Sequence, residues 1–495
     1  MADLPLPQQT YQSRSKPFSS ERLLNLLLEK GGQASNKYML IGTPGLKEYY
    51  NFGGNQPALG MIYLRGFLVL ATNVGVSILY KDLYNNITLI KQVPWGDVPQ
   101  NPPASPIQMV TNGNDVLLLN SDSEFNQLAI VTCSSDEPEG GMKNPDNWSV
   151  SIPAVSETQP ANAKYTSIAY ISGVFLASMQ INGVSYVQFT DVLKTELKYT
   201  FQLDTALTNL TALKGNMREV WAFGANSIEV LAPTGEASND FFAHIPGAYI
   251  NKGCVCKNSI ATYESAFLFY GSDGNIYSSD GYALKQISTP ALLDMIKSWG
   301  VLETEDQRKS VIGQVFAQGG HIFYMLKFKT FGKTIMYDIT TGSWLERETG
   351  DGDEWEGEYI VRRPSGELLV SSKSRPVLYK MDSDYHTDDG KTICREFVFA
   401  TISLPAKKRM FFHSLTLEVD TGLGPDDHVM LSWSDDGGYT WHKERMLSLG
   451  NFGQYNRKLQ FRRLGSSITR TFRVRMSTAS MINVLRADVD FEQEQ

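Results

Sequence analysis

The feature that most constrains the fold is a repeat of paired apolar runs, joined by short turns rich in glycine and asparagine. Residues 68–71 and 76–80 flank one such turn at Asn73, and residues 174–177 and 184–187 flank another. Apolar residues that alternate with a period of two predict β-strands. Glycine and asparagine supply the positive φ that hairpin turns require. The repeat therefore predicts a chain built mainly of β-hairpins.

The spacing of the repeat predicts a β-propeller. Its units recur at intervals of about 40 to 55 residues between Leu59 and Asp382, which is the length of a four-stranded propeller blade. Seven units are present, and one of them could be an inserted hairpin, so we expect six or seven blades over residues 46–390. Stacking such sheets around an axis would bury both faces of each sheet.

The pattern changes near Cys394 to longer runs, such as residues 415–419 and 472–476, in which apolar residues alternate strictly with polar or charged ones. Strict alternation is typical of antiparallel strands with one face in a core and the other in water. We therefore expect residues 391–495 to form an antiparallel β-sandwich-like domain. The expected fold class is mainly β, with few helices.

Two segments carry helix signals. Thr289 can cap a helix that begins at Pro290 and has leucine and isoleucine side chains on one stripe. A second candidate helix covers residues 20–32, which contain two clusters of leucines and end in a glycine pair. Residues 1–18 are polar, and we expect a mobile arm or one ordered only by a partner. Residues 1–45 would then comprise an arm and a short helix.

The charge balance argues against some functions. The 53 acidic residues exceed the 45 basic ones, whereas a protein that coats nucleic acid or an anionic membrane needs a basic face. Residues 394–495 carry 14 Lys/Arg and 12 Asp/Glu, and the rest of the chain carries 31 and 41. We therefore expect an acidic propeller and a mildly basic terminal domain. Arg65, Asn73 and Ser77 interrupt the most apolar stretch, residues 59–80, so we expect no membrane-spanning segment.

A short motif in the terminal domain matches the Asp-box pattern S-x-D-x-G-x-T-W, with residues Ser434, Asp436, Gly438, Thr440 and Trp441. In such a turn the aspartate accepts backbone N–H groups, the glycine takes an unusual φ, and the tryptophan packs against the sheet. The motif occurs in sialidases and in β proteins without activity. A glycosidase would also need a paired acid and nucleophile in a cleft. The structural role is favoured, and a sialidase-like, glycan-active enzyme is the alternative.

Other motifs for chemistry fail on residue type. The acidic loop at residues 351–358 has Trp355 and Glu356 where an EF-hand needs an oxygen ligand and a glycine. Two segments that end like phosphate-binding loops have Lys327 and Tyr385 where the motif needs its first glycine. Four cysteines are too few for a disulfide framework. We therefore expect no catalytic residue, no cofactor and no metal.

A set of basic residues in the terminal domain is a candidate subunit interface; it comprises Lys407, Lys408, Arg409, Arg462, Arg463, Arg473 and Arg475. Two interpretations remain open, a solvated face of the sandwich and a contact with an acidic neighbouring subunit. Arg473 and Arg475 project to one side of a strand, which suits paired carboxylates on another subunit. Aromatic residues do not interleave with these charges, which disfavours direct DNA readout.

Several stretches resemble the packaged-DNA stabilisation, or tail hub (nozzle), family of short-tailed bacteriophages. The most specific likeness is C-terminal, in residues 431–432, 436–437, 444–446, 457–458, 462–465 and 472–475. A second similar stretch extends from residue 228 to residue 261, and residues 43–46 resemble the family's Pro-Gly turn. The resemblance runs nearly from end to end.

This resemblance implies a structural virion protein of a short tail rather than an enzyme. Family members form a ring, usually a hexamer, below the portal and adaptor, where they close the DNA channel, stabilise the packaged genome and conduct it during ejection. The implied partners are the head-to-tail adaptor, a tail fibre or tailspike, and a tail needle or plug. Genomic DNA would pass the lumen without sequence-specific binding. A non-viral propeller scaffold and the sialidase-like enzyme remain alternatives.

Overall fold

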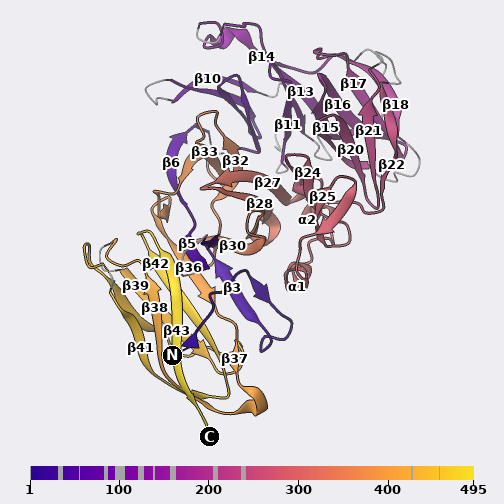
Figure 1. Cartoon of the computed structure of the whole chain (residues 1–495). Coiled ribbons are helices and arrows are strands. Elements are labelled where there is room, and N and C mark those ends of the chain that lie inside the picture. Colours follow the sequence, from indigo (N-terminus) through magenta and orange to yellow (C-terminus); the bar gives the residue numbers. More distant parts are fainter. Residues whose placement is uncertain are drawn as a thin grey trace.

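The computed structural model describes residues 2–31, 37–54, 56–82, 87–94, 106–120, 127–137, 140–155, 163–203, 210–235, 241–424, 427–455 and 457–494. It comprises a β-propeller and a β-sandwich joined side by side, and both chain termini lie at the sandwich (Figure 1). The predicted fold class, mainly β with a propeller followed by a sandwich and few helices, is confirmed.

The propeller has seven four-stranded antiparallel blades within the described residues; five are separate sheets, and the sixth and seventh belong to a larger sheet that also contains sandwich strands. The first blade comprises β7 (Gly60–Leu64), β8 (Phe67–Ala71), β9 (Gly75–Lys81) and β10 (Ile87–Pro94), and the second comprises β11 (Gln108–Thr111), β12 (Val116–Asn120), β13 (Gln127–Cys133) and β14 (Trp148–Ser151). The third blade comprises β15 (Lys164–Ile171), β16 (Val174–Ile181), β17 (Val184–Thr190) and β18 (Leu197–Gln202). The fourth comprises β19 (Leu210–Asn216), β20 (Glu219–Gly224), β21 (Ile228–Pro233) and β22 (Phe242–Ile250).

The remaining three blades complete the circle. The fifth blade comprises β23 (Ala261–Tyr263), β24 (Ala266–Tyr270), β25 (Ile276–Asp280) and β26 (Ala283–Gln286). The sixth comprises β27 (Val311–Gln318), β28 (His321–Phe328), β29 (Lys333–Asp338) and β30 (Ser343–Thr349). The seventh comprises β32 (Gly357–Arg362), β33 (Leu368–Ser372), β34 (Val377–Asp382) and the N-terminal strand β6 (Gly45–Asn51). Short strands β31 (Asp353–Glu354) and β35 (Thr387–Asp388) lie before and after the seventh blade in the chain.

A strand from the N-terminal part of the chain closes the propeller. β6 is antiparallel to β34, with Gly45 opposite Asp382 and Asn51 opposite Val377, so β6 is the outer strand of the seventh blade. The inner strand of that blade, β32, packs beside β7 of the first blade. Opening the ring at this point would therefore break a sheet as well as a packing contact.

Turn chemistry and aromatic packing explain why this sequence forms blades. Ser172 and Gly173, which join β15 to β16, have φ of 50° and 86°, the conformation that the predicted two-residue hairpin turn requires. Adjacent blades are packed by aromatic side chains. The ring centroids of Trp221 and Phe267 lie 4.9 Å apart between the fourth and fifth blades. Such pairs stabilise the packing beyond the area that they bury.

The sandwich has two sheets, and strands from the N-terminal segment belong to both. One sheet has the order β4 (Leu26–Lys30), β5 (Tyr38–Gly42), β43 (Asn483–Gln493), β38 (Met410–Val419) and β41 (Leu459–Ser467), with β1 (Ala2–Asp3) also on β43. The other contains β3 (Ser20–Leu24), β36 (Lys391–Val398), β42 (Thr469–Thr478), β39 (Asp427–Ser434) and β40 (Arg445–Gly450), and β37 (Ile402–Ser403) pairs with β42. A single large core of buried side chains extends from the sandwich into the propeller.

The helix predicted after Thr289 is confirmed. α1 spans Pro290–Ser298, and the Thr289 side chain accepts a hydrogen bond from the backbone N–H of Leu292. A shorter helix, α2 (Glu305–Lys309), has a capping box at Thr304. Single 3-10 turns occur at η1 (Pro145–Asn147), η2 (Lys257–Ser259), η3 (Lys329–Phe331) and η4 (Pro405–Lys407).

The predicted N-terminal helix is wrong, because its described residues form β3 and β4 instead. Leu23 and Leu26 are fully buried. A strand that is buried on both faces has a continuous run of apolar residues, and a short run of this kind cannot be distinguished from a buried helix by its pattern. The expected free arm is also wrong for residues 2–18. β1 pairs with β43, and β2 (Tyr11–Gln12) pairs with β3.

Asn25 is the point at which the chain passes from one sandwich sheet to the other. It lies between β3 and β4, is fully buried and has a positive φ of 54°. Its side-chain Nδ2 donates to the carbonyls of Glu348 at 3.0 Å and Cys394 at 2.7 Å, and its Oδ1 accepts from the Glu348 N–H at 3.1 Å. Asparagine is one of the few residues with a Cβ that adopt this conformation readily. The amide thus replaces strand pairing at the crossing.

Substitution of Asn25 separates the contribution of its hydrogen bonds from that of its backbone conformation. We expect Asn25→Ala to lower the free energy of unfolding by about 3 to 4 kcal/mol, because buried partners lose their bonds and alanine must hold a positive φ. Asn25→Gly removes only the bonds and should cost about 2 to 3 kcal/mol. Urea unfolding followed by tryptophan fluorescence measures both, and an alanine variant as stable as the wild type would contradict the assignment.

Candidate functional site at the domain junction

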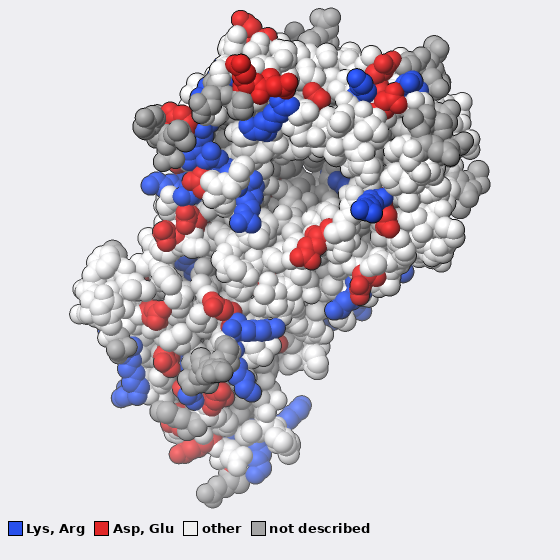
Figure 2. Space-filling model, turned by 45° about the horizontal axis from the view of Figure 1, so that its top comes forward, with Lys and Arg blue, Asp and Glu red and all other residues white. Residues whose placement is uncertain are grey.

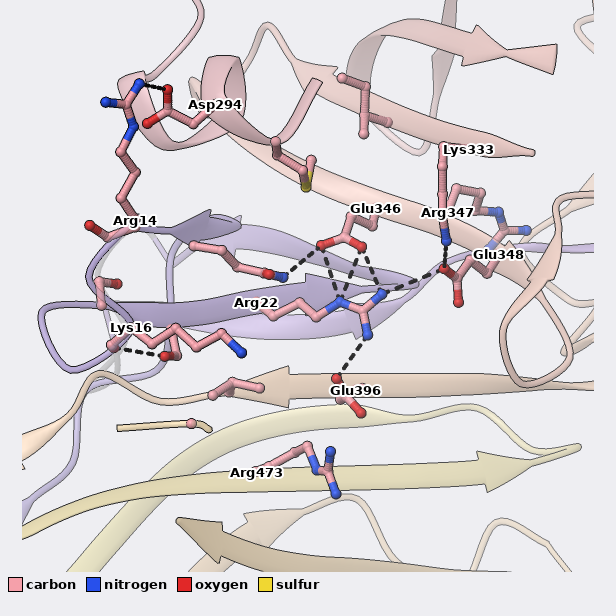
Figure 3. A pocket seen from close by; sticks show the side chains of 18 of the residues that line it. Arg14, Lys16, Arg22, Asp294, Lys333, Glu346, Arg347, Glu348, Glu396 and Arg473 are labelled. Carbon is pink, nitrogen blue, oxygen red and sulfur yellow. Dashed lines mark hydrogen bonds and ion pairs between the residues drawn. The ribbon is translucent and has the colours of Figure 1, made fainter. Parts of the chain in front are cut away.

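A cleft of about 480 Å³ lies where the propeller, the sandwich and the N-terminal segment meet. Its lining comes from the β2–β3 hairpin, from α1, from β29 and β30 of the sixth blade, from β36, and from the loop that carries the Asp-box (Figure 3). β3 positions these elements, because it is parallel to β30 at one point and antiparallel to β36 on its other side. One strand therefore belongs to the edges of both domains.

Arg22 on β3 joins three carboxylates from two domains (Figure 3). Its Nη2 lies 2.7 Å from Oε2 of Glu346 and 3.5 Å from Oε1 of Glu348, both on β30. Its Nη1 lies 3.0 Å from Oε1 of Glu396 on β36. Burial disfavours the charge of Arg22, but Glu346, Glu396 and Glu348 together raise its pKa above the ordinary value. The guanidinium therefore stays charged and holds the domains together.

A second guanidinium fixes the segment that crosses into the propeller. Arg347 on β30 is 2% exposed, and its Nη2 donates to the carbonyl of Pro44 at 2.5 Å. It also donates to the hydroxyl of Thr43 and lies 3.4 Å from Asp388. These contacts hold the chain between β5 and β6. β30 of the sixth blade therefore fixes the segment that crosses from the sandwich to the propeller.

The Asp-box residues form one hydrogen-bonded turn. Oδ1 of Asp436 accepts the backbone N–H groups of Tyr439 and Thr440, both at 2.9 Å, and the hydroxyl of Ser434 at 2.6 Å. Its Oδ2 accepts the hydroxyl of Thr440, also at 2.6 Å. The hydrogen bonds from Ser434 and Thr440 lower the pKa of Asp436 well below its usual range. The carboxylate is thus engaged in holding the turn.

The same turn is a docking point for the N-terminal segment, which the sequence did not reveal. The hydroxyl of Ser20 donates to the carbonyl of Gly437 at 2.8 Å. A Cβ at Gly437 would lie 2.5 Å from Cα of Pro17, so only glycine permits this close approach. Lys16 lies over the ring of Tyr439, 4.9 Å from its centroid. The Asp-box turn, Trp441 and Gly438 thereby form part of the junction cleft.

Two of the predicted interface arginines face carboxylates of their own chain. Nη1 of Arg475 lies 3.2 Å from Glu444, and its Nε lies 3.4 Å from Glu396. Arg473 lies over the ring of Trp441, 4.4 Å from its centroid. Both side chains project from β42 on the face opposite the core, as the alternating pattern predicted. Their carboxylate partners in the structure belong to neighbouring elements of the same chain.

The other five residues of the predicted basic set lie elsewhere on the sandwich. Lys407, Lys408 and Arg409 are exposed in the loop before β38. Arg462 and Arg463 are exposed on β41, in the sheet that does not contain β42. The structure therefore divides the predicted set among β42, β41 and the loop before β38, and a role in subunit contact stays a prediction.

The arrangement at the junction is suited to mechanical coupling. Lys333 pairs with Glu348 at 3.2 Å, so the charges that line the cleft are largely paired with one another.

Among the described residues, no group of three or more His, Cys, Asp or Glu is placed to hold a metal. No helix in the described ranges is long and apolar enough to cross a membrane. Figure 2 shows that basic and acidic side chains are interspersed around the central hollow of the propeller.

The protein is therefore a two-domain β protein in which the N-terminal segment connects the propeller to the sandwich through strand pairing and ion pairs. The family model described as bacteriophage P22 Gp10, β-propeller, matches residues 2–386, and the model described as bacteriophage P22 Gp10, β-sandwich, matches residues 396–492. The chain therefore belongs to the bacteriophage P22 Gp10 family, a phage tail protein family of packaged-DNA stabilisation. No curated protein matches the chain. The predicted family resemblance is confirmed.

Solved structures that match the chain share little of its sequence. Virginiamycin B lyase from Staphylococcus aureus is 12% identical, with 68% of this chain and 98% of that chain covered and a TM-score of 0.41. The WD40 β-propeller domain of Doa1 is 11% identical, with 68% and 97% covered and a TM-score of 0.37. The AfRom2 CNH domain is 10% identical, with 68% and 99% covered and a TM-score of 0.38. Similarities this low carry no conclusion about function.

Removal of the Arg22 guanidinium tests the coupling between the domains. We expect Arg22→Met to lower the free energy of unfolding by about 3 kcal/mol, because it leaves three partly buried carboxylates without their shared cation. Arg14→Met is the matched control, since Arg14 also pairs across the junction but its side chain is 78% exposed, and the change should leave the stability close to that of the wild type. Urea unfolding and the rate of limited proteolysis measure the effect. Equal losses in the two variants would contradict the role of Arg22.

The Asp-box turn gives a pH-dependent prediction. Because hydrogen bonds depress the pKa of Asp436 in the folded state, its contribution is complete above the unfolded value, about 3.9, and is lost as the pH falls through the folded value. We expect Asp436→Asn to cost about 1 kcal/mol near neutral pH, after allowance for solvent screening. The difference from the wild type should shrink at about pH 2.5. A difference that grows in acid would refute the assignment.

Proposed function

We propose that this protein is a virion component of a short phage tail that forms a ring-shaped nozzle below the portal and adaptor. In this position it closes the DNA exit channel, stabilises the packaged genome and conducts it during ejection. The ring is a hexamer, and its partners are the head-to-tail adaptor, a tail fibre or tailspike and a tail needle or plug. The single observation that carries the proposal is the family match, which extends over both domains.

The junction supports this function on mechanical grounds. A conduit wall under pressure from packaged DNA must keep its domains in a fixed arrangement, whereas two domains on a flexible linker move relative to each other. Here the chain crosses between propeller and sandwich at β5–β6 and again at β35–β36, and β3 is hydrogen-bonded to both domains. Such a unit resists bending between its domains.

The charge of the chain also supports a passage for DNA rather than a binding site for it. The chain has a formal net charge of −8, and the basic side chains on the propeller face in Figure 2 alternate with acidic ones. Strong binding to DNA phosphates requires clustered cations that displace counterions. DNA would therefore slide past the nozzle, and retention of the genome depends on closure of the channel.

The hydrogen bonding of the Asp-box does not favour the glycan-active alternative. A catalytic carboxylate must be free to exchange a proton or attack a sugar carbon. Asp436 instead accepts three hydrogen bonds at one oxygen and at least one at the other, all from its own turn. The motif therefore supports a structural role in this chain.

Electron cryomicroscopy of phage particles with and without the protein tests the proposed function. We expect an axial ring of density below the portal and adaptor in wild-type particles, and its loss in particles made without the chain. Particles without the chain should also release their DNA, because the exit channel is open. Density at another location, or complete retention of DNA without the protein, would contradict the proposal.

A further inference from the structure

A groove on the outer face of the sandwich lies apart from the junction. Its volume is about 660 Å³, and its floor is formed by β38 and β43. The loops that form its wall are tied to each other, since the hydroxyl of Thr421 donates to the carbonyl of Gln454 at 3.0 Å and Gly453 N–H donates to the carbonyl of Gly422 at 3.1 Å. These bonds tie the two described loop segments to each other.

The groove has the chemistry to receive a basic segment. Glu418, Asp420 and Asp488 contribute carboxylates. Asp488 pairs with Arg486 at 2.9 Å and Asp420 accepts a hydrogen bond from Asn483 at 2.7 Å, whereas Glu418 is exposed without an ion pair among the described residues. The ring of Tyr455 is 67% exposed, and Met481 is 44% exposed. Carboxylates bind ammonium and guanidinium groups, aromatic faces attract the same cations, and apolar surface accommodates the methylene stems of lysine.

Arg457 and Lys458 also line the groove, on the wall that carries Tyr455. The backbone N–H of Arg457 donates to the hydroxyl of Thr421 at 3.0 Å, so this wall lies next to Asp420, while Glu418 has no ion pair among the described residues. The mixed charge therefore does not close the groove to a basic segment. It restricts how such a segment can be seated.

The same domain presents a matching basic loop at its far end. Lys407, Lys408 and Arg409 are exposed, and within the described ranges none of them forms an ion pair with a carboxylate. Ala406 and Lys407 have positive φ, 59° and 53°, so the loop turns tightly after Pro405. A tight loop of this kind presents its lysines to solvent in a limited set of positions.

The groove and the basic loop cannot meet within one chain. They lie at opposite ends of β38, which spans ten residues, or about 30 Å of extended strand. The carboxylates and the lysines are complementary in charge, so the basic loop of one copy can enter the groove of the next. A contact between two different surfaces of identical subunits is heterologous, and its repetition builds a ring when the rotation closes.

We propose that the groove formed by β38, β43 and the loops of Leu423 and Tyr455 receives the Lys407–Arg409 loop of a second copy of this chain. This inference rests on the proposed ring function and identifies one contact between neighbouring subunits. The lysine and arginine head groups pair with Glu418 and Asp420, and the lysine stems pack on Tyr455 and Met481. The predicted basic set thus contributes to assembly through its exposed loop rather than through Arg473 and Arg475.

Disulfide trapping in assembled phage particles tests the contact. The variant carries Lys408→Cys and Met481→Cys together with Cys133→Ser, because Cys133 is the partly exposed native cysteine among four free ones. A disulfide needs Cα atoms within about 7 Å, so a bond between these two positions must join two chains. We expect mild oxidation to give a ladder of cross-linked chains on a denaturing gel. The matched control pairs Lys408→Cys with Lys285→Cys, an exposed position on β26 of the propeller, and should remain monomeric.

Each outcome of the trapping experiment has a distinct meaning. If the variant is present in particles and forms no more cross-links than the control, the proposed contact is wrong while the nozzle function stands. If particles do not contain the wild-type chain at all, the nozzle function itself is wrong. A ladder specific to positions 408 and 481 supports both.

Charge exchange provides a second test that needs no cysteine. When the variant is the only copy of the chain available, Lys407→Glu and Glu418→Lys should each lower incorporation into particles by about ten-fold, which corresponds to roughly 1.4 kcal/mol. The chain with both changes should recover, because each altered loop then meets an altered groove. Recovery distinguishes pairing from misfolding, and a double variant as poor as the single ones would overturn the contact.

Discussion

The pairing of β3 on both of its sides, with β30 of the propeller and with β36 of the sandwich, is the constraint on which the rest of the structure depends. This pairing brings Glu346, Glu348 and Glu396 together in a partly buried site. Glu348 also pairs with Lys333, and Glu396 also pairs with Arg475. Arg22 nevertheless contacts all three carboxylates, so it compensates their mutual repulsion and their loss of hydration. The N-terminal segment therefore stabilises this arrangement of the two domains.

The topology makes the propeller an insertion within the sandwich. Strands from both ends of the chain form the sandwich sheets, and β6 closes the propeller after leaving one of those sheets. Load between the domains would pass through sheet hydrogen bonds and buried ion pairs instead of a single linker. For the proposed tail component, this stiffness would hold the channel wall in shape. The exposed ends of the sandwich remain available for neighbouring subunits.

The sequence was sufficient to predict the propeller, the sandwich and α1, because turns, helix caps and apolar periods are local signals. The family followed from the resemblance of several stretches to its members. The sequence was not sufficient for the N-terminal strands, since consecutive leucines buried on both faces look the same in a strand and in a helix. Asn25, which lies between the two leucine clusters, could have indicated that the segment is not one continuous helix, because asparagine tolerates a positive φ. The Arg22 site was not predictable, because Glu346 and Glu396 lie 324 and 374 residues away.

Small-angle X-ray scattering of the isolated protein tests the central claim that the N-terminal segment locks the two domains into one body. The account predicts that one fixed arrangement of propeller and sandwich reproduces the scattering curve over its whole range, at low and at high salt. A curve that requires several relative orientations of the domains would contradict it.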